Sequence, residues 1–434
     1  MVELQMRCSF CGVPQSPDLP LIAGLQGHIC PACVKLASQV VAGWNKNKAR
    51  DHRPKELPKP MELKALLDEY VIGQDMAKET LSVAVYNHFK RLMCEESEST
   101  DIARSDTRVE VSKSNVLLVG PTGSGKTLLL RTLAKILDVP FIVADATSLT
   151  QAGYVGDDVE NIISRLVDAA DGNIAAAEWG IIYLDEVDKL ARKGDGSVGV
   201  RDISGEGVQQ SLLKMVEGSE IKLPGKGSGR NREPTGEVIK TDNILFIAGG
   251  AFAGIEEYID RRMHSDKSTM GFHAEIEHKE ISELSREDVM NDMVTDDLRQ
   301  FGLIPEFIGR FHVLAMLQKP SLDDLVRILT EPKDALVRQY QRLYEYDSVA
   351  LEFDEEALTA IAELADERGT GARGLRGVIE HVLRKSMFEV PSKTNINHCY
   401  VDAMVVRGDG EIVYDYKEDD QDGSQQADVV SVGG

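Results

Sequence analysis

The chain has 434 residues, more than one ordinary core requires, so two or three domains are expected. Hydrophobic residues make up 42% and charged residues 28%, as in a soluble globular protein, and no apolar run reaches the roughly 18 residues that span a bilayer. The formal net charge of −23, from 72 acidic and 49 basic residues, disfavours DNA as the main substrate, because binding to phosphates requires clustered Lys and Arg.

The N-terminal part, residues 1–42, predicts a zinc-binding module in a cytoplasmic protein. Met1 to Cys11 lacks the basic and apolar regions of a secretory signal. Two CxxC pairs have 18 residues between them, a spacing typical of zinc ribbons, because each pair directs two thiolates towards one tetrahedral point. The four cysteines are Cys8, Cys11, Cys30 and Cys33. Two disulfides or a redox pair are the alternative, which a reducing cytosol disfavours, and His28 is a less favoured substitute ligand.

Residues 43–60 are predicted to form a flexible linker, because they combine several basic residues with three prolines. Contact with nucleic acid is the alternative role of these charges. A helical pattern then leads to Tyr70, and a further helix runs to about Met93. Residues 95–114 are polar and charged, and we interpret them as a surface insertion.

Residues 61–318 predict a large α/β domain with a parallel sheet between helices. Short apolar strands are expected at 115–119, 140–144, 181–184 and 243–248, and helices separate them. Beyond Pro320 the apolar residues recur at helical spacing, which predicts a smaller, mostly helical domain at 319–416. The acidic tail, 417–434, is expected to be disordered.

A phosphate-binding loop is predicted directly after the strand at 115–119. Residues 120–127 fit the pattern GxxxxGK[ST] between a strand and a helix, the context that this motif requires. Glycines let backbone N–H groups point at phosphate oxygens, Lys126 would reach the β- and γ-phosphates, and Thr127 would bind Mg²⁺. The loop consists of Gly120, Pro121, Thr122, Gly123, Ser124, Gly125, Lys126 and Thr127.

Two carboxylates end the apolar strand at 181–184 and complete the predicted ATP site. In a parallel sheet this strand end lies beside the phosphate loop. Asp185 would hold the Mg²⁺ shell, and Glu186 would orient and polarise the attacking water. Solvated turn residues are the alternative, which the upstream phosphate loop disfavours.

From about residue 61 to residue 413 the chain resembles the ClpX-type AAA+ unfoldases, and Cys8 to Cys33 resembles the N-terminal zinc domain of that family. The resemblance rests on the phosphate loop, on Gly153-Tyr-Val-Gly156, on Leu184-Asp-Glu-Val-Asp-Lys189, and on downstream segments. These segments begin at Arg201, Gly302 and Thr370. The resemblance implies an AAA+ fold and ATP, Mg²⁺ and Zn²⁺ as cofactors.

The resemblance also implies roles for particular residues. Val71 and Ile72 would flank the adenine base. Arg310 would be an arginine finger that acts on ATP bound by a neighbouring subunit, which requires a ring, in this family a hexamer. Arg373 would contact phosphate from the small domain of the same chain. Taken alone, either arginine more often forms a surface ion pair. We assign no sensor residue on the strand that ends near Gly249.

Two further segments carry implied contacts with proteins. Tyr154 and Val155 would form the pore loop that grips substrate, and the alternative is an ordinary turn with a packed Tyr. Met270, Gly271 and Phe272 stand where the family has an aliphatic-Gly-Phe tripeptide that docks the peptidase. Here the tripeptide begins with methionine, an apolar side chain that can occupy a pocket.

The sequence thus predicts an ATP-dependent unfoldase that recognises tagged substrates and adaptors and delivers unfolded chains to a ClpP-type serine peptidase ring. It contains no nucleophile elbow and no metalloprotease motif, so we expect no peptidase activity of its own. A stand-alone chaperone, a DNA-remodelling motor with a zinc ribbon and a nucleotide-gated adaptor without hydrolysis are the alternatives. No membrane partner is expected, and nucleic acid is disfavoured.

Overall fold

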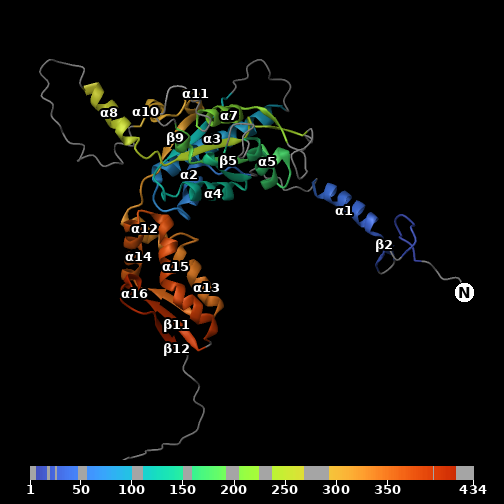
Figure 1. Cartoon of the computed structure of the whole chain (residues 1–434). Coiled ribbons are helices and arrows are strands. Elements are labelled where there is room, and N and C mark those ends of the chain that lie inside the picture. Colours follow the sequence, from blue (N-terminus) through green and yellow to red (C-terminus); the bar gives the residue numbers. More distant parts are fainter. Residues whose placement is uncertain are drawn as a thin grey trace, which may run out of the picture.

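The computed structural model describes residues 6–16, 20–24, 27–46, 56–99, 111–149, 159–191, 205–223, 237–267, 293–393 and 395–416. Figure 1 shows a body built on a sheet, with a second, C-terminal body that begins with α12 (Leu322–Thr330) below it. No helix among the described residues is long and apolar enough to cross a membrane.

A five-stranded parallel sheet with the order β4-β5-β8-β3-β9 forms the centre of the α/β domain. The strands are β3 Asn115–Val119, β4 Phe141–Asp145, β5 Ile181–Asp185, β8 Leu245–Gly250 and β9 Phe311–Met316. The central strands are almost entirely buried, because helices cover both faces. A separate antiparallel pair consists of β6 Glu220–Lys222 and β7 Val238–Lys240.

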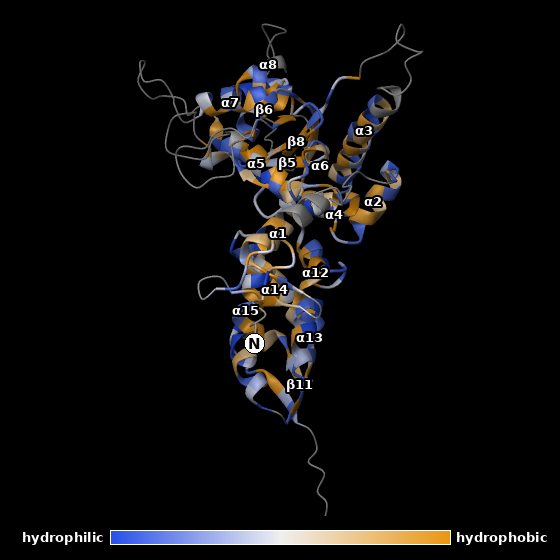
Figure 2. Cartoon of the chain, turned by 90° about the vertical axis from the view of Figure 1, so that its right-hand side faces the viewer, coloured by the Kyte–Doolittle hydropathy of each residue, from blue (hydrophilic) through white to orange (hydrophobic). Residues whose placement is uncertain are grey.

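Alternate residues of the strands pack into two apolar clusters, one on each face of the sheet. In β5, Ile181 and Tyr183 belong to the cluster with α2, α3 and α4, whereas Ile182 and Leu184 belong to the other. The first face carries α2 Pro60–Asp68, α3 Asp75–Ser99 and α4 Lys126–Leu137. The second face carries α5 Val159–Ala169, α6 Ile174–Ala177, α7 Glu206–Glu217, α8 Glu256–Lys267, α10 Thr295–Phe301 and α11 Pro305–Ile308, with the turns η2 Ala146–Ser148 and η3 Val187–Leu190. Figure 2 shows the hydrophobic strands β5 and β8 inside this body.

The C-terminal body has its own apolar core and combines helices with a small sheet. Its helices are α12 Leu322–Thr330, α13 Leu336–Tyr346, α14 Glu355–Glu367, α15 Ala372–Glu389, η5 Val390–Ser392 and α16 Ala403–Arg407. The sheet contains β10 Ala350–Phe353, β11 Ile396–Val401 and β12 Val413–Tyr416, in that order. A reciprocal pair of hydrogen bonds holds the segment between β9 and α12, because the Gln74 amide donates to the Gln318 carbonyl and accepts from the Gln318 N–H, both at 2.8 Å.

The N-terminal module contains little regular structure. Two short antiparallel strands, β1 Ile22–Ala23 and β2 His28–Ile29, precede helix α1 Pro31–Lys46. This helix therefore includes the first residues of the predicted linker.

The strands and helices expected from the pattern are present in the described residues, and the structure adds β6, β7 and β9, which the pattern did not predict. Besides the extension of α1 into the predicted linker, two features differ from the expectation. Helix α3 runs to Ser99 and so includes the start of the segment that we interpreted as a surface insertion. Glutamates favour helix, and Arg91 forms an ion pair with Glu95 one turn later, at 3.0 Å. The smaller domain, predicted as mostly helical, also contains a three-stranded sheet. Its strands are short, so the helical pattern of the surrounding sequence conceals them.

Candidate functional site

The phosphate loop lies between β3 and α4, as the motif predicts, and its glycines adopt backbone conformations that other residues avoid. Gly123 and Gly125 have φ of 83° and 95°. A Cβ atom on Gly123 would also lie 2.6 Å from the Thr370 carbonyl oxygen, so this glycine permits close contact with the C-terminal body. The Ser124 hydroxyl is buried and has no hydrogen-bond partner within the described part of the chain. An unpaired buried donor at a helix N-terminus fits an anionic ligand.

Lys126 and Thr127 begin helix α4 and face the acidic end of β5. The Lys126 ammonium donates to the carbonyls of Gly120 and Pro121 at 2.6 and 3.1 Å. Burial lowers the pKa of Lys126, and the nearby Asp185 carboxylate opposes this shift. The Thr127 hydroxyl donates to Asp185 Oδ2 at 3.4 Å, so the two residues expected to bind Mg²⁺ are adjacent.

Asp185 and Glu186 diverge at the end of β5. Asp185 Oδ1 accepts hydrogen bonds from the Tyr183 hydroxyl and the Glu186 N–H, both at 2.9 Å. Glu186 has φ of 60°, in the left-handed region, which turns the chain out of the strand direction. Its carboxylate accepts from Lys189 Nζ at 2.6 Å.

These groups line one cavity of about 810 Å³, a size within the usual range for ligand sites. It lies between the sheet edge and the C-terminal body, and Arg373 and Arg376 of α15 line it together with the phosphate loop. Arg376 donates to Gln339 at 2.7 Å. The structure therefore brings together Gly123, Lys126, Asp185, Glu186 and Arg373.

Val71 and Ile72 are not among the residues that line this cavity, whereas the preceding Tyr70 is. Val71 is buried in the apolar cluster of α2, α3 and α4, and its carbonyl accepts from Lys78 Nζ. Contact of Val71 and Ile72 with adenine stays a prediction.

Arg310 lies between α11 and β9 and is not among the residues that line this cavity. Its guanidinium forms an ion pair with Glu217, with a distance of 2.9 Å from Nε to Oε1. The side chains of Arg310 and Glu217 are 48% and 40% exposed, so the Arg310 guanidinium is accessible from solvent.

Sequence reasoning included Tyr183 and Asp188 in its motifs but assigned no role to either residue. Tyr183 lies two residues before Asp185, so the period of a strand could have placed both on one face. Asp188 Oδ2 accepts from the Phe252 N–H at 3.3 Å, which connects η3 to the segment after β8. The contact between Asp188 and Phe252 depends on the pairing of β5 with β8, which the sequence does not show.

Five predicted residues lie outside the described residues. They are the pore residues Tyr154 and Val155 and the docking residues Met270, Gly271 and Phe272.

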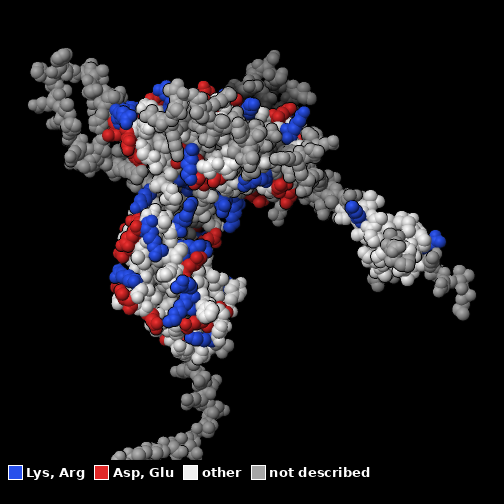
Figure 3. Space-filling view, in the orientation of Figure 1, with Lys and Arg blue, Asp and Glu red and all other residues white. Residues whose placement is uncertain are grey.

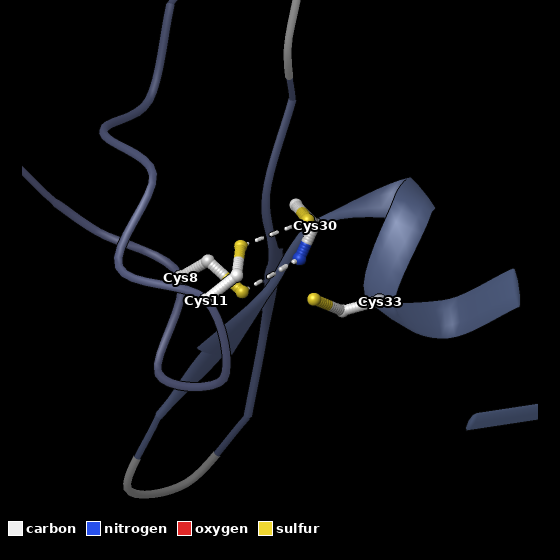
Figure 4. Close-up of side chains that lie close together, drawn as sticks. All are labelled: Cys8, Cys11, Cys30 and Cys33. Carbon is white, nitrogen blue, oxygen red and sulfur yellow. Dashed lines mark hydrogen bonds between the residues drawn. The ribbon is translucent and has the colours of Figure 1, made fainter. Parts of the chain in front are cut away.

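The four cysteines of the N-terminal module converge, as Figure 4 shows. Their Sγ atoms all lie within 4.8 Å of one another, and those of Cys11 and Cys30 are 3.7 Å apart. Zn–S bonds of about 2.3 Å in a tetrahedron require sulfur separations of about 3.8 Å. Hydrogen bonds from backbone N–H groups, that of Cys11 first, lower the pKa of Cys8 to about 6, whereas a hydrogen bond with Cys11 and burial raise that of Cys33 to about 12. Four thiolates at this spacing need a cation, so the cluster fits Zn²⁺.

Comparison with known proteins relates each part of the chain to a family. Residues 6–43 match the ClpX C4-type zinc finger, residues 111–314 the AAA domain (Cdc48 subfamily), and residues 318–402 the C-terminal, D2-small domain of ClpB protein. The chain is 54% identical over 423 residues to the ATP-dependent Clp protease ATP-binding subunit ClpX 3 of Methylococcus capsulatus, with 97% of each chain covered. It is 52% identical over 405 residues to the ATP-dependent Clp protease ATP-binding subunit ClpX of Azotobacter vinelandii, which covers 93% of this chain and 90% of that one.

Proposed function

The chain belongs to the ClpX-type family of AAA+ ATPases, and from this premise we propose that it unfolds tagged proteins and translocates them into a Clp-type peptidase. It is an ATPase with a zinc finger, and its cofactors are Mg²⁺ and Zn²⁺. We propose the domain boundaries 1–42, 43–60, 61–318, 319–416 and 417–434. A cytoplasmic location is part of the proposal, because a four-thiolate zinc site requires a reducing compartment.

The observation that carries the proposal is the convergence of the phosphate loop, the acidic strand end and Arg373 on one cavity. In this arrangement Lys126 binds phosphate, and Thr127 and Asp185 would hold Mg²⁺. The metal ion, when bound, neutralises charge on the phosphoryl oxygens. Glu186 orients the attacking water. Arg373, which lies in the C-terminal body, binds a phosphate group of the ATP.

The cavity also supports coupling of ATP turnover to movement. Gly123 contacts the segment at Thr370 and Gly371, which immediately precedes helix α15. A change of the phosphates bound by the loop would therefore act directly on the orientation of the C-terminal body. We propose that this movement drives Tyr154 and Val155 along the substrate.

A ring explains the position of Arg310. A finger that acts on its own site would line its own cavity, but Arg310 points to Glu217 at an exposed position. We therefore propose a homohexamer in which Arg310 reaches the ATP of the neighbouring subunit. Met270, Gly271 and Phe272 would dock the ClpP-type peptidase ring.

The zinc module supports a protein partner, such as a substrate or an adaptor. Its exposed apolar side chains include Phe10, which is 75% exposed, Ile22 and Leu36. Arg7 and Lys35 are the only Lys, Arg, Asp or Glu residues among the described residues up to 38.

The charge distribution bears on the DNA-motor alternative. Figure 3 shows acidic and basic residues intermixed over the visible face of the C-terminal body. The DNA-motor alternative is therefore not favoured.

The test combines a tagged, stably folded fluorescent protein with ATP, with and without a ClpP-type peptidase, and compares the wild type with Glu186→Gln. We expect loss of fluorescence to require ATP, intact Glu186 and, for irreversible loss, the peptidase. Loss of fluorescence with ATP alone, unchanged by the peptidase, would favour a stand-alone chaperone. ATP hydrolysis without loss of fluorescence under any condition would contradict the proposal.

A further inference from the structure

Tyr183 is a buried tyrosine next to the candidate metal ligand. Residues two apart in a strand point to the same face, so Tyr183 and Asp185 both face α4 and the phosphate loop. The Tyr183 side chain is fully buried in the apolar cluster below this site. A buried phenol hydroxyl needs a hydrogen-bond partner, and its partner here is Asp185 Oδ1 at 2.9 Å.

The two carboxylate oxygens of Asp185 accept different hydrogen bonds. Oδ1 accepts from Tyr183 and from the N–H of Glu186, both at 2.9 Å. Oδ2 accepts the longer bond, 3.4 Å, from the hydroxyl of Thr127, the other expected metal ligand. Two short bonds on one oxygen set the rotation of the carboxylate, so the other oxygen is directed towards Thr127.

The neighbouring strand leaves space for the phenol. Ile247 lies opposite Tyr183 in the pairing of β5 and β8, and Gly249 follows on the same face. A Cβ atom on Gly249 would lie 2.5 Å from the Tyr183 hydroxyl oxygen and 2.7 Å from Cε2. Any side chain at position 249 would therefore displace the phenol, and the hydroxyl of Tyr183 occupies the space that such a side chain would take.

We infer that Tyr183 is a positioning residue for the metal ion of the ATP site: its hydroxyl holds Asp185 with Oδ2 directed to the side of Thr127, and Gly249 makes this position accessible. The inference rests on the proposed role of Asp185 as a metal ligand. Partners that orient a ligand typically change metal affinity by about 10- to 100-fold when they are removed. One hydrogen bond of two on Oδ1 remains in Tyr183→Phe, so we expect the lower end of this range.

The test measures Mn²⁺ binding to the full chain with saturating ADP, by electron paramagnetic resonance of free Mn²⁺. Tyr183→Phe is expected to raise the Kd for Mn²⁺ by about 10-fold. The matched control is Tyr400→Phe, because Tyr400 also lies in a strand and donates to a carboxylate, Asp354 Oδ2 at 3.3 Å, in the C-terminal sheet. This control should keep the wild-type Kd. An unchanged Kd in a folded Tyr183→Phe would overturn the inference even if hydrolysis falls, since Tyr183 would then only fill space.

Gly249→Ala supplies a second arm in case Tyr183→Phe does not fold. It keeps the hydroxyl but forces the phenol away from its position, so the Kd for Mn²⁺ should rise as well. A folded Gly249→Ala with wild-type Mn²⁺ affinity would overturn the role of the phenol position. Asp185→Asn separates this failure from that of the proposed ligand: if it leaves the Kd unchanged, Asp185 is not a ligand, and the inference fails with it.

Discussion

The zinc module and the ATP site both gather metal-binding side chains, but the relation between ligands and fold is opposite. In the module, strands of two residues and one helix surround four cysteines, and its apolar side chains are largely exposed. In the α/β domain, a five-stranded sheet with an apolar cluster on each face positions Thr127 and Asp185. The metal ion therefore holds the module together, whereas the sheet holds the ligands of the ATP site.

Removal of zinc is expected to have the largest effect. Structural zinc contributes about 10–16 kcal/mol to the folding of small zinc domains, so chelation or Cys8→Ser should unfold the module. ATP hydrolysis by the α/β domain should persist, because its core does not depend on zinc. Zinc release with a colorimetric chelator, followed by limited proteolysis, measures the first effect. Cys94→Ser is the control. A module that stays protease-resistant without zinc would contradict the statement that the metal ion holds the module together.

Gln209 tests whether buried polar contacts stabilise the α/β domain independently of zinc. Its buried amide donates to the Leu190 carbonyl and accepts from the Ile304 N–H, both at 2.8 Å. These bonds connect η3, which follows Asp185, to the segment before Arg310. Gln209→Leu leaves two buried backbone groups unsatisfied, at a cost of about 1–3 kcal/mol each.

We expect Gln209→Leu to lower the melting temperature of the α/β domain without changing zinc content. The neighbouring Gln210→Leu serves as the control, because Gln210 is exposed and its side chain donates to Glu206 one turn earlier, at 3.2 Å. Equal melting temperatures for the two variants would show that the Gln209 contacts do not stabilise the domain.

His88 predicts a dependence of α/β domain stability on pH. Burial lowers the pKa of His88 from 6.5 to about 3, and its Nε2 lies 3.0 Å from the Asn243 carbonyl oxygen. Below pH 6.5 the unfolded chain binds a proton at this histidine that the folded chain does not bind until about pH 3. As the pH is lowered from 6.5 towards 3, the free energy of unfolding should therefore fall by about 1.4 kcal/mol for each pH unit.

Thermal melting between pH 7 and pH 4.5 measures this dependence. His88→Gln should reduce the slope, because it removes the titrating group. The same slope in wild type and variant would assign the acid sensitivity to other groups.

Glu217 gives the smallest expected effect. Its ion pair with Arg310 is exposed, and such pairs contribute about 0–1 kcal/mol. Glu217→Gln should leave stability unchanged and alter ATP turnover by at most about 5-fold, whereas Arg310→Ala should abolish most turnover in the assembled ring. Turnover as a function of protein concentration checks both. A turnover in Arg310→Ala equal to wild type would exclude the finger role.

Much of the ATP site could be predicted because its chemistry is contained in short segments. The phosphate loop occupies eight consecutive residues, and Asp185 and Glu186 end a continuous apolar strand. The position of Arg373 required the family resemblance, since nothing in its own segment indicates phosphate. A linear pattern does not show that Tyr70 lines the cavity while Val71 packs in the apolar cluster of α2, α3 and α4, and the contact of Val71 and Ile72 with adenine stays a prediction.

The sequence by itself determined the nucleotide chemistry, the zinc-binding cysteines and the alternation of strands and helices, since each is encoded in short segments such as the phosphate loop, the acidic strand end and the two CxxC pairs. Only the tertiary structure decided that Gly249 admits Tyr183, that Gln209 connects two distant segments, and that Gly123 contacts the C-terminal body. The physical reason is that these contacts join segments far apart in the chain, and strand order and helix packing alone set which of them meet.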